Sequence, residues 1–140
     1  FSVPCPEARS APTFTRLGFH PGFGLTVTLP AAVGATPEAL LLSPHRRVNG
    51  DDAFKMGLAS VLVPLAEVRA AAMRLAAEIA ENSPLGLIAT RASLRGDLAE
   101  RVRAATENEL KQQTLLRRTQ DFHEGVKAVA ERRVPDFRGR

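Results

Sequence analysis

Leu17-Gly18-Phe19-His20-Pro21-Gly22-Phe23-Gly24 is the stretch of this 140-residue sequence on which the fold assignment depends. Its glycines and its proline are typical of a loop that brings the backbone close to another group. Residues 13–17, just before it, are consistent with a short strand. Residues 25–33, just after it, alternate as in a strand, although Pro30 disfavours both a central strand and a helix interior. Local pattern alone therefore predicts a strand over 25–33.

Short elements are expected in the next part of the chain. Thr36-Pro37-Glu38 is a strong helix start, since Thr accepts backbone hydrogen bonds at the N-cap and Pro fits the first helical position. The expected elements are a helix over 36–42, an extended segment over 46–48, a short helix from Asp51 or Asp52 to Gly57, and an apolar strand over 58–63.

From residue 65 onward the pattern predicts helices. The clearest covers residues 65–82, and three more are expected over 85–94, from Asp97 to about 119, and from Asp121 to before Pro135. The helices are rich in Ala, whose small side chain buries little area, so they need other surfaces to pack against. The apolar stripe of the first helix consists of Leu65, Val68, Ala72, Leu75 and Ile79.

The composition is that of an ordinary globular domain, with 44% apolar and 24% charged residues. No apolar run approaches the roughly 18–20 residues needed to span a bilayer, so we expect a soluble, cytoplasmic protein without a membrane partner. The single cysteine, Cys5, indicates a reducing compartment, and no neighbouring His activates it. Because the first residue is Phe1 and not Met, we expect the chain to be a fragment of a longer protein.

The net charge of +4 leaves nucleic-acid binding as a remote alternative. Arginines alternate with glutamates along residues 101–109, including Glu109, as on a solvated helix face. Trp and Tyr are absent, which weakens a base-stacking mode, so no nucleic-acid partner is expected. The histidines lack metal-ligand spacing and predict no metal site. They are His20, His45 and His123, of which the last two are expected at the surface.

Six segments, in order and spacing, resemble motifs of the enoyl-CoA hydratase/isomerase (crotonase) family. Residues 17–24 resemble its LGxxPGxGG loop, and 29–34 (LPAAVG) resemble LPRxVG. Residues 46–59 resemble RxxxAxEAxxxGLV, and 61–64 (VLVP) its VVP. Residues 121–129 (DFHEGVKAV) resemble DFxEGxxAF, and 131–137 (ERRVPDF) resemble EKRxPxF. One such motif is weak, but six in register are strong.

The resemblance implies an α/β fold and places the chain in the C-terminal half of the family. Residues 1–12 would be an irregular lead-in. Residues 13–64 would be the C-terminal part of a crotonase-like ββα spiral core, and 65–140 a helical trimerisation region that forms trimers or hexamers. It also implies that residues 25–33 are helical, against the local pattern.

The family stabilises a thioester enolate with two backbone N–H groups, and neither motif is present here. A catalytic Glu of its hydratases lies four residues before the glycine that corresponds to Gly18, where this chain has Phe14, which transfers no proton. Candidate catalytic residues are His20, titratable near neutrality, and Glu7, in a PEAR segment that resembles the family's PEVR but lies too far from Gly18. The alternative interpretation of His20, which the sequence favours, is a loop residue that is hydrogen-bonded to backbone.

Other residues are candidates for substrate binding. Pro21 and Gly22 would border the acyl pocket, with Gly22 leaving room for a ligand, although a turn that needs positive φ is an equal interpretation. Phe19 and Phe23 would line that pocket or, as the pattern favours, pack in a core. Phe137-Arg138 resembles a family Phe-Lys/Arg pair that reaches coenzyme A phosphates, or else it is a frayed terminus.

Two interpretations of function remain open besides the nucleic-acid alternative. The chain is a fragment of an acyl-CoA-processing enzyme that hydrates or isomerises enoyl-CoA thioesters through an enolate, or it is a catalytically inactive assembly module. Under the first, acyl-CoA is the substrate and no other cofactor is expected.

Overall fold

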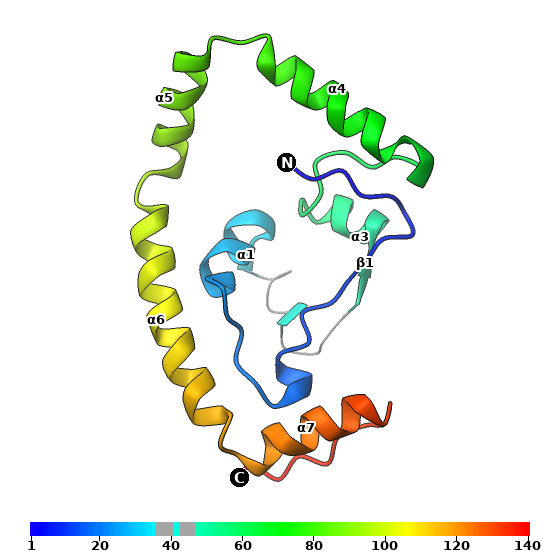
Figure 1. Ribbon diagram of the computed structural model, residues 1–140, viewed down its shortest axis with the longest axis vertical. Helices are drawn as coiled ribbons and strands as arrows, with labels where there is room; N and C mark the ends of the chain where they lie inside the picture. The colour runs from blue at the N-terminus through cyan, green and yellow to red at the C-terminus, as the bar shows by residue number, and fades with distance from the viewer. Residues whose placement is uncertain (36–40, 43–46) are drawn as a thin grey trace. The chain divides into compact units, whose positions relative to one another are not determined.

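The computed structural model describes residues 1–35, 41–42 and 47–140 (Figure 1). It contains two compact units that are interleaved in sequence: unit 1 comprises residues 1–10 and 48–100, and unit 2 comprises 11–47 and 101–140. Within the described ranges, no helix is long and apolar enough to cross a membrane. The elements are β1 (Arg9–Ser10), η1 (Thr15–Leu17), α1 (Leu25–Val33), β2 (Val48–Asn49), α3 (Gly50–Lys55), η2 (Leu65–Glu67), α4 (Val68–Ala80), α5 (Pro84–Arg95), α6 (Leu98–Leu116) and α7 (Gln120–Ala130).

Unit 1 contains a short antiparallel pairing between distant parts of the chain. In β1 and β2, Arg9 lies opposite Asn49 and Ser10 opposite Val48. The first twelve residues therefore contribute a strand, although their prolines favour irregular structure. A proline cannot donate a backbone hydrogen bond to a neighbouring strand, but this applies only to the proline itself. Both residues of β1 follow Pro6 and have a backbone N–H group.

The apolar run 58–63 does not form the expected strand. The neighbouring N–H groups of Ser60 and Val61 both donate to the carbonyl of Ser2, at 2.9 and 3.3 Å. A regular ladder does not give two successive residues the same acceptor, because they point in opposite directions. The run is therefore held against the start of the chain without joining a sheet.

Short-range capping differs from expectation at α3. Asn49 is the N-cap, and its Oδ1 accepts a hydrogen bond from Asp52 N–H at 2.8 Å. The expected caps, Asp51 and Asp52, lie instead in the first turn, where their charges complement the helix dipole. Both residue types suit an N-cap, and Asn49 is the one with extended backbone.

The long helices are confirmed with small shifts of their ends. In α4, Val68, Leu75 and Ile79 of the predicted stripe are half-buried, but Ala72 in its middle is exposed and the neighbouring Ala71 is buried instead. Leu65 lies in η2 and is exposed. The hydroxyl of Ser83 caps α5 by accepting from Gly86 N–H at 3.3 Å.

Unit 2 places a helix, α1, where the local pattern favours a strand. The helix implied by the family resemblance is confirmed, and Pro30 lies inside it. Residues 13–17 also differ from the expected strand. The N–H of Leu17 donates to the carbonyls of Thr13 and Phe14 at 3.2 and 2.9 Å, which closes the turn η1 locally.

The turn η1 packs against α7 at a glycine. A Cβ on Gly125 would lie 2.5 Å from the backbone carbon of Leu17, so this crossing needs the missing side chain. α7 is capped by Thr119, whose hydroxyl accepts from Phe122 N–H at 3.1 Å, and not by Asp121 as expected.

The expected helix over 36–42 lies mostly outside the described residues. Leu41 and Leu42 are described, and they are helical and buried. Arg46, the first residue of one family motif, and His45 also lie outside those residues. Among the described residues, the other buried apolar side chains of unit 2 are Leu29, Val33 and Ala128, and those of unit 1 are Cys5, Val48, Ala53, Ala59 and Ala71.

Candidate functional site

The loop over residues 18–24 turns through left-handed backbone at both ends. Gly18 has φ 65°, and Phe23 and Gly24 have φ 62° and 70°. Gly22 is not among the positive-φ residues of the described chain, so the expectation that it needs positive φ is wrong. A Cβ there would lie 2.6 Å from Nε2 of Gln113. The space that Gly22 leaves is therefore taken by the Gln113 amide.

His20 is half-buried, and its ring bonds to the backbone. Nδ1 lies 2.7 Å from the carbonyl oxygen of Pro21. Because a carbonyl only accepts, Nδ1 carries the proton and the neutral ring keeps its lone pair on Nε2. The backbone interpretation of His20 is therefore confirmed for Nδ1, and Nε2 is the atom at which this side chain exchanges protons in any catalytic role.

Glu109 is a site residue that the sequence pattern places wrongly on a solvated helix face. Its side chain is 1% exposed. One carboxylate oxygen accepts from the N–H of Gly24 at 2.8 Å. The other accepts from the N–H and the hydroxyl of Thr26 at 3.1 and 2.6 Å. Glu109 therefore holds the end of the loop and the start of α1 against α6.

Hydrogen bonding keeps Glu109 ionised in spite of its burial. Burial raises the pKa of this carboxyl, but the bonds from the Thr26 hydroxyl and from the N–H groups of Gly24 and Thr26, with the nearby His20, lower it overall. The same N–H groups mark the positive end of α1. Since the carboxylate occupies them, they do not serve as donors to a developing oxyanion.

A cleft of about 430 Å³ brings together two of the predicted substrate-binding residues, Phe19 and Phe137. The ring of Phe19 stacks at a tilt on Phe122 of α7, with centroids 5.0 Å apart. Phe19 therefore packs against α7 while remaining half-buried, and it also lines the cleft. The lining residues are Thr15, Gly18, Phe19, Leu116, Thr119, Asp121, Phe137, Gly139 and Arg140.

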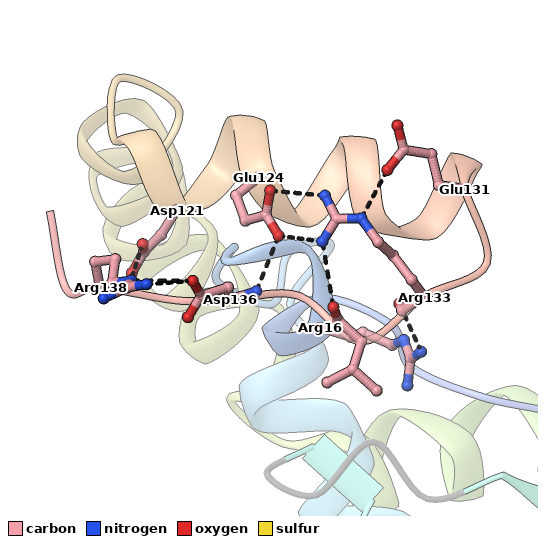
Figure 2. A network of polar contacts seen from close by, with 8 residues as sticks. Arg16, Asp121, Glu124, Glu131, Arg133, Asp136 and Arg138 are labelled. Atoms are coloured by element: carbon pink, nitrogen blue, oxygen red, sulfur yellow. Dashed lines mark hydrogen bonds and ion pairs between the residues drawn. The ribbon is translucent and has the colours of Figure 1, made fainter.

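The tail after α7 is bound to that helix, so the interpretation as a frayed terminus is wrong. The carboxylate of Asp121 accepts from the N–H groups of Arg138 and Gly139, both at 2.8 Å. Figure 2 shows the tail running back along α7, with the Arg138 guanidinium bonded to Asp136. The Arg138 side chain is thereby held by a neighbour, although it remains largely exposed.

The remaining candidates are dispersed. Phe23 is 92% exposed, so core packing is wrong for this residue. Glu7 is exposed and belongs to unit 1, whereas His20 belongs to unit 2, so neither unit alone contains both. Phe14 is half-buried and precedes η1. His123 is exposed, as expected.

Comparison with known proteins gives consistent matches. The family model for enoyl-CoA hydratase/isomerase matches residues 3–140. The 2,3-dehydroadipyl-CoA hydratase of Escherichia coli K12 is 34% identical over 124 residues, covering 89% of this chain and 49% of that protein. The mitochondrial methylglutaconyl-CoA hydratase 1 of Pyricularia oryzae is 33% identical over 149 residues, covering 90% and 41%.

The fold is also shared with solved structures. The enoyl-CoA hydratase/isomerase from Pseudoalteromonas atlantica T6c aligns with a TM-score of 0.88 at 25% identity, covering 97% of this chain and 55% of that one. The chain spans about half the length of the curated relatives it matches. With a family match along nearly its whole length, this chain belongs to the enoyl-CoA hydratase/isomerase family.

Proposed function

We propose that the protein to which this chain belongs processes acyl-CoA thioesters, by hydration or isomerisation of an enoyl group through an enolate. The single observation that carries the proposal is the family match over residues 3–140, with relatives named as CoA hydratases. In this proposal the chain is the C-terminal half of the enzyme. It acts on a coenzyme A thioester as substrate and needs no further cofactor.

The proposed role of this chain is to hold substrate more than to transfer protons. Phe14 stands at the position of a hydratase Glu, and no proton passes through its ring. The donors at the start of α1 are taken by Glu109. The paired carboxylates and the oxyanion donors would then come from another part of the enzyme, with His20 Nε2 as the acid–base candidate here and Glu7 as a weaker one.

The residues proposed to contact substrate are Phe19, Pro21, Gly22, Phe23, Phe137 and Arg138. The cleft between η1 and the tail supports Phe19 and Phe137, because it is lined mainly by apolar groups and includes cationic Arg140. Arg138 lines a second hollow that shares Asp121 and Arg140 with this cleft. Pro21 is buried at the base of the loop. Gly22 keeps only a backbone role, since Gln113 fills the space beside it. Phosphate groups would pair with Arg138 once it leaves Asp136.

A second candidate is a catalytically inactive assembly module that forms trimers or hexamers. It is favoured by α5, which buries none of its side chains and leaves Ile88 64% exposed. Exposed aliphatic side chains on one helix are typical of a surface that another protein covers.

The test is to titrate the purified 140-residue chain with crotonyl-CoA in a calorimeter, with free coenzyme A as control, and to follow enoyl absorbance for turnover. We expect binding of the thioester without turnover. Turnover by this chain would overturn the assignment of proton transfer to another part, and His20 and Glu7 would be mutated first. Absence of binding, together with a discrete oligomer in light scattering, would favour the assembly module.

A further inference from the structure

Two side chains on one face of α6 contact the loop over residues 18–24, one near its middle and one at its end. Glu109 bonds to Gly24 and Thr26 at the end of the loop, through two oxygens and three donors. Gln113 lies four residues later, and residues four apart share one helix face. Its Nε2 donates to the carbonyl of His20 at 3.0 Å. The loop is therefore held at two points by a single helix.

The contact at Gln113 is close as well as polar. Gly22 has no side chain, and a Cβ in its place would lie 2.6 Å from Gln113 Nε2. Pro21 and Gly22 are both buried. The loop therefore lies close against α6 at Gly22, with hydrogen bonds to the helix on either side.

Between the two contacts lies Phe23, in left-handed backbone that non-glycine residues rarely adopt. Its ring is 92% exposed while Gly22 and Gly24 beside it are buried. A strained backbone conformation that also exposes an apolar ring is stable only when contacts with the surrounding residues hold it in place. Glu109 and Gln113 supply that restraint.

We infer that Glu109 and Gln113 are positioning residues, which hold the loop so that Phe23 is presented as an apolar contact for the acyl group of a thioester. Neither residue touches the ligand. The ligand part of this inference rests on the proposed function, while the positioning part depends only on the loop.

Glutamine cannot replace Glu109 without loss. The carboxylate accepts at both oxygens, whereas the amide of Gln has one oxygen and one NH₂ donor. If the amide oxygen faces the N–H of Gly24, the NH₂ group faces the N–H of Thr26. In the other orientation the NH₂ group faces the N–H of Gly24. One buried N–H is left without an acceptor either way. E109Q thus disrupts the hydrogen bonds between Glu109 and the loop while keeping a side chain of nearly the same size.

The experiment uses four single variants of the 140-residue chain. E109Q weakens the hydrogen bonds of Glu109 to the loop, and Q113A removes the hydrogen bond from Gln113. E107Q and Q112A make the same chemical changes at neighbouring positions of α6. Backbone amide resonances of residues 20–26 report the loop, circular dichroism reports the helices, and titration with crotonyl-CoA against free coenzyme A reports the acyl contact.

We expect E109Q and Q113A to shift the loop resonances and to weaken crotonyl-CoA binding about fivefold to tenfold at a temperature where the helices are intact. E107Q and Q112A should do neither. The inference is overturned if E109Q only lowers the melting temperature while the loop resonances stay in place, or if the loop moves and affinity does not. If the wild-type chain binds no thioester, the proposed function fails and the ligand part fails with it. The loop resonances then decide the positioning part alone.

Discussion

The guanidinium of Arg133 and the carboxylate of Glu124 form a two-point ion pair, with Nη1–Oε1 and Nη2–Oε2 distances of 2.5 and 2.9 Å (Figure 2). Oε1 of Glu124 also accepts from the N–H of Asp136 at 2.9 Å, and Arg133 Nε donates to Glu131 at 2.6 Å. The pair joins the middle of α7 to the tail that follows it. Paired N–H donors fix both distance and direction, so the tail leaves α7 at a defined angle.

This pair predicts a loss of stability in acid. Arg133, and then the N–H of Asp136, lower the pKa of Glu124 from 4.5 to about 2. A carboxyl whose pKa is lower in the folded chain than in the unfolded chain stabilises the folded state at pH values above its unfolded pKa. This stabilisation is lost as the pH falls toward the folded pKa. We expect the melting temperature to fall between pH 4.5 and about pH 2, with Glu109 acting in the same direction. Thermal melts of the wild type and E124Q test this, and equal slopes in both would contradict it.

Replacing Asp121 should release the tail without unfolding α7. D121A removes the acceptor for the N–H groups of Arg138 and Gly139. Two hydrogen bonds to a charged group are lost, so we expect amide exchange at both positions to become about tenfold faster. D136A is the matched control, because that carboxylate bonds the Arg138 side chain. Equal exchange in the two variants would contradict the assignment to Asp121.

Two glycine-to-alanine changes in helices should have opposite signs. In G125A the new Cβ would lie 2.5 Å from the carbonyl carbon of Leu17. A backbone atom cannot move away by changing rotamer as the end of a side chain can. We expect a loss of about 1–3 kcal/mol in the free energy of unfolding. In G86A the nearest atom is Ser83 Cβ at 3.5 Å, an ordinary contact. Alanine there should add about 0.5–1 kcal/mol. Thermal denaturation of both variants gives the comparison, and a stabilised G125A would contradict the close crossing.

Phe23 should be dispensable for stability. Its ring is 92% exposed, so F23A should change the free energy of unfolding by less than about 0.5 kcal/mol. F23G should raise it by about 0.5–1 kcal/mol, because glycine adopts φ near 62° without strain. Both variants should lose affinity for crotonyl-CoA. A marked destabilisation of F23A in urea titrations would mean that the ring packs against the protein.

The helices were predictable where their signals are local. The apolar periodicity of residues 65–82 predicts a helix from neighbouring residues alone, and α4 forms there. α1 shows the limit of this reasoning. Its residues alternate as in a strand, and only the family motif at 29–34 indicated a helix. The contacts that decide it come from Glu109, more than eighty positions away.

Glu109 was missed because charge spacing cannot distinguish a solvated glutamate from a buried one whose partners are backbone N–H groups. A signal was nevertheless present. α1 starts at Leu25 after Gly24, with no side-chain cap and no acidic residue in its first turn. A helix start without local acceptors needs one from elsewhere in the chain. The missing strand at 58–63 has a similar origin, because its partner carbonyl at Ser2 is also distant in the sequence.

The interleaving of the two units has a consequence for synthesis. The last residue of unit 1 is Glu100, whereas Asp121 in unit 2 bonds to Arg138, Gly139 and Arg140. During synthesis from the N-terminus, all residues of unit 1 are therefore made before residues 101–140. Residues 11–47 can complete unit 2 only after those later residues, which include most of α6 and all of α7, have been made. No single cut separates the units either, because each is built from two stretches that flank part of the other.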